Sequence, residues 1–279
     1  MKKRIEVSKI VVFCIMFILS ILFIVPFVWT LLTSLKINTE IYSSTVILLP
    51  SKITFEHYIK VITQMKEFLQ YSYNTLSVTF WTVLGTAILS SMTGYAFSKL
   101  EFWGKQFYLT FILLVLTLPY AIYLIPIYIM EDKVNIINTH LGLILPYIAI
   151  NLPMSIFIMR GNFNSIPNGL MEAAIIDGCN FFQVWRRVVM PLAKPAVATI
   201  VIFTFINSWG EFMMARTLSY NPAGQTLAVG ITFLRDEAAS WQYGTLCATI
   251  TLSLIPLLIV FLSMQKYFIK GIMEGALKG

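Results

Sequence analysis

The side chains best suited to bind a partner lie close together in a polar stretch past the middle of the chain. Two carboxylates, Glu172 and Asp177, offer charges that a basic partner could pair with. Ala173 and Ala174 lie between them, and their small side chains allow a partner to approach closely. Gly178 can take positive φ at little cost, so it is expected to end a helix in a sharp turn.

The spacing around these residues predicts two short helices set at an angle to each other. Ser165 and Pro167 indicate the start of the first helix. This helix has one small, flat face, formed by residues at helical spacing: Leu170, Ala173, Ala174 and Asp177. The second helix begins at Phe181, passes through Val188 and Met190, and is expected to stop at Pro191. Such a pair predicts an element that sits in a groove on a partner protein.

A second group of candidate residues follows the next apolar run, at Trp209-Gly210-Glu211-Phe212. A carboxylate within a lipid-spanning segment is costly and indicates a functional group, but Glu211 also lies near the predicted outer interface, where water could hydrate it. Trp209, Tyr120 and Tyr123 could stack on a bound substrate, or they could anchor the chain at the membrane interface. Both readings stay open from the residues alone.

The remaining residue types argue against an enzyme. Cys14, Cys179 and Cys247 suggest no disulfide framework, and His57 and His140 have no Cys or acidic neighbours at metal-ligand spacing. We therefore expect no metal site and no catalytic residue. The chain also lacks the Gly-x-x-x-x-Gly-Lys-Ser/Thr phosphate loop, so we expect it to bind no ATP or other cofactor itself.

The elements that carry these residues are predicted to be membrane-spanning helices. Of the 279 residues, 58% are hydrophobic and only 12% are charged, about half of what soluble domains carry. Because a helix needs about 20 apolar residues to cross a bilayer, the uncharged runs predict an all-α membrane protein with six spans: 10–35, 71–98, 107–130, 141–160, 195–215 and 244–265.

The distribution of basic residues orients these spans. More Lys and Arg fall in the segments 1–9, 99–106, 161–194 and 266–279 than in the segments 36–70, 131–140 and 216–243. By the positive-inside rule the first four segments, with both termini, are cytoplasmic and the other three lie outside. The net charge of +7 follows from this topology, so no nucleic-acid partner is needed to explain it. The apolar stretch after Met1 is longer than that of a cleavable signal peptide, and we interpret it as a retained first span.

Two patterns inside the spans predict helix packing. Ala87 and Ser91 are four residues apart, as are Ser90 and Gly94, and small residues at this spacing let helix backbones approach closely. Prolines seven residues apart, Pro119 with Pro126 and Pro146 with Pro153, are expected to share one helix face within their spans. Those faces either kink for packing or border a polar path.

The stretch from Glu172 to Pro191 resembles the signature loop of permease subunits of ATP-binding-cassette importers. That loop reads Glu-Ala-Ala, three residues, Gly, nine residues, then aliphatic-x-aliphatic-Pro, and Val188 and Met190 fill its aliphatic positions here. The resemblance covers nearly the whole chain and is greatest to the maltose-type second permease of sugar importers. It includes Asn74-Thr75-Leu76, Ile125-Pro126-Ile127-Tyr128, Asn151-Leu152-Pro153, Thr226-Leu227-Ala228-Val229-Gly230 and the tail 271–279. Gly210 stands where the family has Asn.

The resemblance implies the type I importer permease fold and alternating access in a bacterial plasma membrane. It implies a second homologous permease, two ATPase subunits that bind ATP and Mg²⁺ and receive the coupling loops, an external solute-binding protein and a sugar substrate. The outer loop 216–243 would reach into the binding protein and the tail would contact the ATPases. Asn151 joins Trp209, Glu211, Tyr120 and Tyr123 as candidates for the substrate path.

Other functions are weighed against this one. An importer permease for peptides, amino acids or glycerol phosphate differs only in cargo, which the loop does not report. A proton- or sodium-driven transporter needs ionisable groups deep in its spans and an inverted repeat, and the predicted deep spans carry no charge. A membrane enzyme needs a chemically useful cluster of His, Asp, Glu or Cys, which the sequence does not show.

Overall fold

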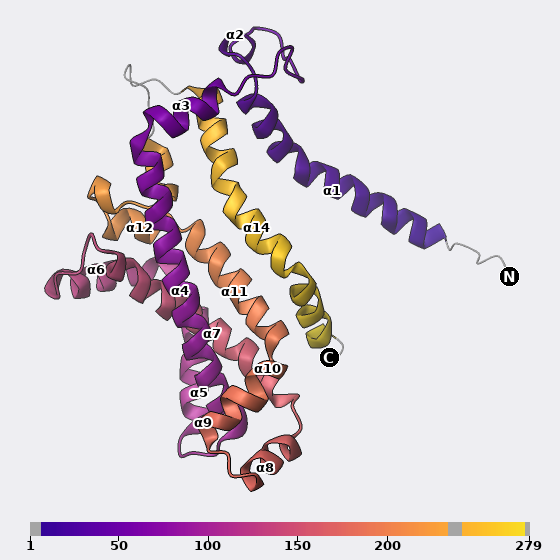
Figure 1. Cartoon of the computed structure of the whole chain (residues 1–279), viewed down its shortest axis with the longest axis vertical. Coiled ribbons are helices and arrows are strands. Elements are labelled where there is room, and N and C mark those ends of the chain that lie inside the picture. Colours follow the sequence, from indigo (N-terminus) through magenta and orange to yellow (C-terminus); the bar gives the residue numbers. More distant parts are fainter. Residues whose placement is uncertain (1–6, 234–241, 277–279) are drawn as a thin grey trace. The chain divides into compact units, whose positions relative to one another are not determined.

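The computed structural model describes residues 7–233 and 242–276, and within these ranges the chain is helical and contains no β-strand (Figure 1). The predicted all-α class is confirmed. Three parts of the sequence predictions lie outside the described residues: the basic start at 1–6, part of the outer loop at 234–241, and the end of the tail at 277–279.

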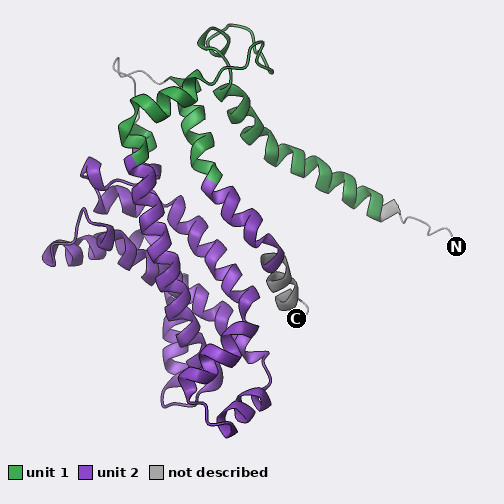
Figure 2. Cartoon of the chain, viewed as in Figure 1, with its two compact units in different colours: residues 1–69, 231–255 green, residues 70–230, 256–279 purple. Residues whose placement is uncertain are grey.

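The chain divides into two compact units, shown in Figure 2. The first comprises residues 1–69 and 231–255, and the second comprises residues 70–230 and 256–279. Two long helices, α4 (Lys66–Lys99) and α14 (Tyr243–Ala276), contribute residues to both units.

The first unit contains α1 (Val7–Ser34), α2 (Asn38–Ile41) and α3 (Glu56–Gln64). His57 on α3 is buried and holds this unit together through both ring nitrogens. Its Nε2 lies 3.0 Å from the Lys36 carbonyl oxygen, and its Nδ1 lies 3.4 Å from the Thr245 hydroxyl at the start of α14. The segment after α1 is thereby fixed to the first turn of α14.

The second unit contains the residues of functional interest. Its elements in chain order are the main part of α4, α5 (Lys105–Leu114), η1 (Val115–Thr117), η2 (Tyr120–Tyr123), α6 (Leu124–Lys133), α7 (His140–Asn164), α8 (Asn168–Ile176), α9 (Phe181–Val184), η3 (Trp185–Val189), α10 (Met190–Leu192), α11 (Lys194–Trp209), α12 (Met213–Leu218), η4 (Pro222–Gly224) and α13 (Leu227–Gly230). A further short turn, η5 (Ile231–Phe233), belongs to the first unit.

Four described helices are long and apolar enough to cross a membrane, namely α1, α4, α7 and α14. Two further segments pass this test only as bent pairs: Lys105–Thr117 with Tyr120–Lys133, bent by 103°, and Phe181–Leu192 with Lys194–Trp209, bent by 81°. The first bend falls within the third predicted span, 107–130, which is therefore not a single straight helix. The second bend lies at Ala193, before the fifth predicted span, 195–215, begins. A hydropathy run records how long a segment stays apolar, and it does not register a bend.

The bends correct two predictions about proline. Pro119 lies in the break before η2 while Pro126 lies inside α6, so this pair does not share one helix face. Pro146 and Pro153 do lie on one helix, α7, and both are buried in its packing. Pro191 is not the last residue of the second short helix, which continues one residue further to Leu192, and the bend follows at Ala193.

α4 and α7 pack at very short range, as the small-residue spacing predicts. A Cβ atom added to Gly94 would lie 2.7 Å from the Cβ of Met159 and 3.1 Å from the backbone nitrogen of Arg160. Next to this contact, a buried apolar cluster joins α4, α7, the α8–α10 loop and α11. Its largest members are Tyr95, Met159, Phe163, Ile166, Met171 and Ile200. The loop is therefore part of the core of this unit.

Candidate functional site

The turn after α8 has the geometry that Gly178 predicts. The Gly178 amide donates to the Ile175 carbonyl at 2.9 Å, and the Cys179 amide donates to the Ala174 carbonyl at 2.9 Å. Gly178 itself has φ +86°. These two hydrogen bonds, together with a residue in the left-handed conformation, form the Schellman motif. The motif provides hydrogen-bond donors for the unpaired carbonyls at the end of a helix and reverses the chain direction.

α9 begins immediately after this turn with a reciprocal cap. The Asn180 side chain accepts from the Gln183 amide at 2.9 Å, and the Gln183 side chain accepts from the Asn180 amide at 2.9 Å. α9 continues through the π-helical turn η3 into α10, so the predicted second helix exists but is wider than an α-helix in its middle. Two local motifs therefore fix the angle between α8 and α9.

The predicted coupling residues divide between the surface and the core. Glu172, Ala173, Asp177 and Gly178 are exposed along α8 and its turn, and Ile176 beside them is 84% exposed. Ala174 is buried in the apolar cluster, against which Val188 and Met190 also pack. The prediction that Ala173 and Ala174 share one exposed face is wrong for Ala174, because the helix turns that side chain towards the core.

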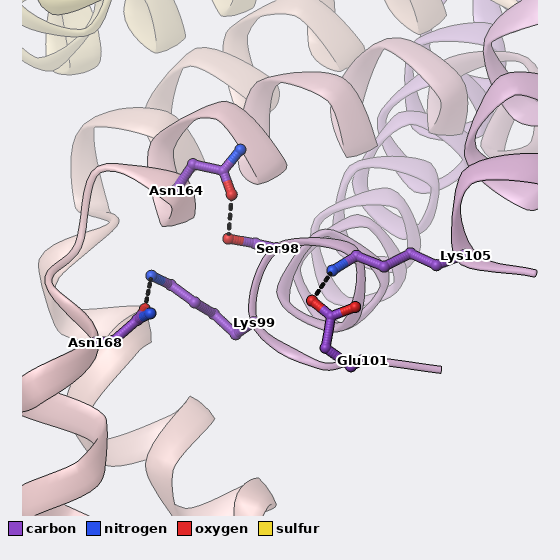
Figure 3. Close-up of polar contacts among 6 residues, drawn as sticks. All are labelled: Ser98, Lys99, Glu101, Lys105, Asn164 and Asn168. Carbon is purple, nitrogen blue, oxygen red and sulfur yellow. Dashed lines mark hydrogen bonds and ion pairs between the residues drawn. The ribbon is translucent and has the colours of Figure 1, made fainter. Parts of the chain in front are cut away.

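The carboxyl-terminal end of α4 is tied to the start of this loop, as Figure 3 shows. The Lys99 ammonium donates to the Ile166 carbonyl at 2.6 Å and to the Asn168 side chain at 2.8 Å. The Ser98 hydroxyl donates to the Asn164 side chain at 2.7 Å. These contacts span the junction between α7 and α8. The sequence analysis missed Lys99, since its partners lie far along the chain.

The amino-terminal part of α4 is tied to the loop before α13. The Asn74 side chain donates to the carbonyls of Ala223 at 2.8 Å and Gln225 at 2.9 Å, and His140 Nε2 lies 3.1 Å from its Oδ1. The Leu227 amide donates to the buried Thr75 hydroxyl at 2.7 Å. α4 has no proline, so one unbroken helix connects the loop before α13 to the α7–α8 junction.

A second site is built around Glu211, in the break between α11 and α12. Its Oε1 accepts from the Tyr120 hydroxyl and from the Met214 amide at 2.8 Å. Its Oε2 accepts from the Tyr147 hydroxyl at 2.6 Å and from the Ala215 amide at 2.8 Å. The carboxylate thus caps α12 and joins α7, η2 and α11. The carboxylate is partly exposed, and all four of these hydrogen bonds come from groups of the chain itself.

These residues line a pocket of about 490 Å³ within the second unit. Its polar lining includes Tyr120, Tyr147, Asn151, Asn207, Ser208 and Glu211. The Asn151 side chain donates to the Tyr147 carbonyl at 2.8 Å and accepts from Asn207 Nδ2 at 3.0 Å. Aromatic and amide groups converge here as they do in sites for small polar ligands.

The structure separates the five candidates for the substrate path. Tyr120, Asn151 and Glu211 line the pocket together. Trp209 does not line it, and its ring stacks on Phe205 with the centroids 5.3 Å apart. Tyr123 is also outside, and its hydroxyl donates to the Val115 carbonyl at 3.1 Å.

Three polar residues of the pocket were not predicted from the sequence: Tyr147, Asn207 and Ser208. The available signal was an amide side chain inside the apolar run that begins at Pro195. Polar groups within spanning helices face the protein interior or a water-filled cavity far more often than lipid, so Asn207 could have been chosen on that ground.

Comparison with known proteins identifies the class. The family model described as binding-protein-dependent transport system inner membrane component matches residues 86–274. The chain belongs to this family, and it has the type I importer permease fold. It is a membrane component of a transport system and not a catalytic enzyme.

Particular relatives agree over almost their whole length. The galactooligosaccharides transport system permease protein GanQ of Bacillus subtilis (strain 168) is 31% identical, over 100% of this chain and 99% of GanQ. The trehalose/maltose transport system permease protein MalG of Thermococcus litoralis is 31% identical, over 94% of each chain. A solved bacterial ABC transporter that imports the acidic polysaccharide alginate has a chain with TM-score 0.84 and 26% identity, covering 96% of this chain and 99% of that one.

Proposed function

We propose that the chain is one permease subunit of an ATP-driven importer for an oligosaccharide. The observation that carries this proposal is the exposed, acidic α8 turn held by its Schellman motif, within a family whose named relatives carry sugars across the membrane. The type of cargo is inferred from the names of the relatives. The use of ATP as the energy source is inferred from the loop that contains α8 and α9. Glycerol phosphate and other non-sugar solutes are the alternative cargo.

In the proposed assembly the chain pairs with a second, homologous permease. Two ATPase subunits bind ATP and Mg²⁺ and each receives one coupling loop, while an external binding protein delivers the sugar. Closure of the ATPase pair moves α8 and α9, and the spans then alternate between inward-facing and outward-facing states. Both termini lie in the cytoplasm, and this chain binds no cofactor or metal.

Contacts at the two ends of α4 support a path for this motion. A displacement of α8 acts on Lys99 through Asn168 and the Ile166 carbonyl. At the other end Asn74 holds the outer loop at Ala223 and Gln225. Since α4 is continuous, the two surfaces that would meet the ATPase and the binding protein move together.

A pull-down experiment tests the ATPase contact. A tagged chain is expressed with its partner permease and ATPase, with and without deletion of residues 172–178. The intact chain should retain both partners, whereas the deletion variant should retain the permease and lose at least about 90% of the ATPase. Retention of the ATPase at the intact level by a membrane-inserted deletion variant would reject the proposed docking surface.

Replacing Lys99 with Met should weaken coupling. The substitution keeps the length of the side chain but removes two charge-assisted hydrogen bonds, each worth about 1.5–3 kcal/mol. We expect sugar uptake and binding-protein-stimulated ATPase activity in proteoliposomes to fall about fivefold or more. Lys105→Met is the matched control, since Lys105 pairs with the exposed Glu101 at 2.9 Å (Figure 3) and such pairs contribute little. Equal activities of the two variants would exclude a role for the Lys99 contacts.

A further inference from the structure

Two neighbouring side chains in the Glu211 pocket have hydrogen-bonding capacity that the chain leaves unused. Asn207 is exposed, and although its Nδ2 donates to Asn151, its Oδ1 has no partner among residues 7–233 and 242–276. Ser208 is 3% exposed, lines the same pocket, and its hydroxyl finds no partner in the same ranges.

Both residues lie near the carboxyl end of α11, and Ser208 is buried there, where an unpaired polar group is costly. A serine or threonine in such a helix usually donates to the carbonyl four residues before it. Thr199 does this on the same helix, donating to the Pro195 carbonyl at 3.0 Å. Ser208 does not, so its hydroxyl remains available at the pocket wall.

The other polar groups of the pocket are already engaged. Both carboxylate oxygens of Glu211 accept two hydrogen bonds each, from the hydroxyls of Tyr120 and Tyr147 and from two backbone amides. Asn151 uses its amide nitrogen on α7 itself and its oxygen on Asn207. The carboxylate therefore shapes the pocket. Asn207 Oδ1 and the Ser208 hydroxyl differ from the other polar groups of the pocket in having no partner within residues 7–233 and 242–276.

We propose that Asn207 and Ser208 form a hydroxyl-binding subsite for the transported sugar. The Asn207 amide offers an acceptor and a remaining donor, and the Ser208 hydroxyl offers both, which matches sugar hydroxyls that donate and accept at once. Phe212 and Met213 line the same pocket and provide apolar surface for the C–H groups of a sugar ring. This inference rests on the proposed sugar import and adds the residues that contact the cargo.

The test uses proteoliposomes that contain the complete importer, with tritiated galactotriose and maltotriose as separate probes. Asn207→Leu should lower uptake of the transported probe about tenfold, and Ser208→Ala about threefold, because each leaves sugar hydroxyls unpaired. Binding-protein-stimulated ATPase activity should stay within about twofold of wild type. Thr204→Val is the matched control: Thr204 is buried with an unpartnered hydroxyl on the same helix but does not line the pocket, so its uptake should not change.

The ATPase measurement separates a sugar contact from a structural role. If the Asn207 and Ser208 variants lose uptake and ATPase activity together, or lose the partner permease on purification, the two residues serve folding or assembly and the subsite is rejected. Unchanged uptake in both variants also rejects it, while leaving sugar import intact. If wild type imports neither probe with ATP present, the proposed cargo fails and the subsite fails with it.

Discussion

Replacing Glu211 with Gln should nearly abolish transport and destabilise the second unit. The carboxylate accepts four hydrogen bonds, and an amide can accept only at its oxygen, so its NH₂ group would face a tyrosine hydroxyl and a backbone N–H. Bonds to a charged group are worth about 1.5–3 kcal/mol each, and we expect a loss of roughly 3 kcal/mol or more. Uptake should fall at least about tenfold, and thermal unfolding in detergent should shift down by at least about 6 °C.

Three variants locate the cause of this effect. Glu101→Gln makes the same substitution on an exposed residue that pairs with Lys105 (Figure 3), and it should leave Tm and uptake near wild type. Tyr147→Phe and Tyr120→Phe each remove one donor to Glu211 and should produce intermediate losses. Full uptake with an unchanged Tm in Glu211→Gln would show that the carboxylate does not hold the α11–α12 break.

Replacing Gly178 with Val should uncouple the importer. Gly178 has φ +86°, a conformation that costs other residues about 1–2 kcal/mol and β-branched residues more. A steric clash is not the cause, because a Cβ atom added to Gly178 would have no other atom within 4 Å. The strain should open the turn and change the angle between α8 and α9. We expect uptake and stimulated ATPase activity in proteoliposomes to fall about tenfold.

Two control variants test whether the effect of Gly178→Val comes from the backbone conformation. Gly178→Asn should keep uptake within about twofold of wild type, because Asn tolerates the left-handed region. Gly169→Val should also be mild: Gly169 lies in α8 with nothing within 4 Å, and its φ is not positive. If Val and Asn at position 178 have equal effects, side-chain bulk at the docking surface and not the turn is responsible.

The coupling loop could be predicted because its structure is local. Gly178 and the helical spacing before it specify the end of α8 within a few residues, and the long apolar runs specify α1, α4, α7 and α14. The bend between Thr117 and Tyr120 could not be predicted in this way, because apolar composition continues through it. The bend at Ala193 differs, since the charged Lys194 beside it marks the predicted boundary between the loop and the fifth span.

The polar contacts of Glu211 and Lys99 could not be predicted from the sequence for a different reason. Glu211 is bound by tyrosines 91 and 64 residues before it, and Lys99 by residues 67 and 69 positions after it. No periodicity in one sequence reports such pairs. Glu211, Tyr120 and Asn151 were predictable as individual polar or aromatic residues, but their meeting in one pocket required the fold.

The most direct test of the central claim is the initial rate of labelled oligosaccharide uptake into proteoliposomes that contain the whole importer. The proposed function predicts uptake that requires internal ATP and the external binding protein, does not respond to a proton or sodium gradient, and is lost on deletion of residues 172–178. Uptake driven by an ion gradient without ATP, or uptake unaffected by the deletion, would contradict it.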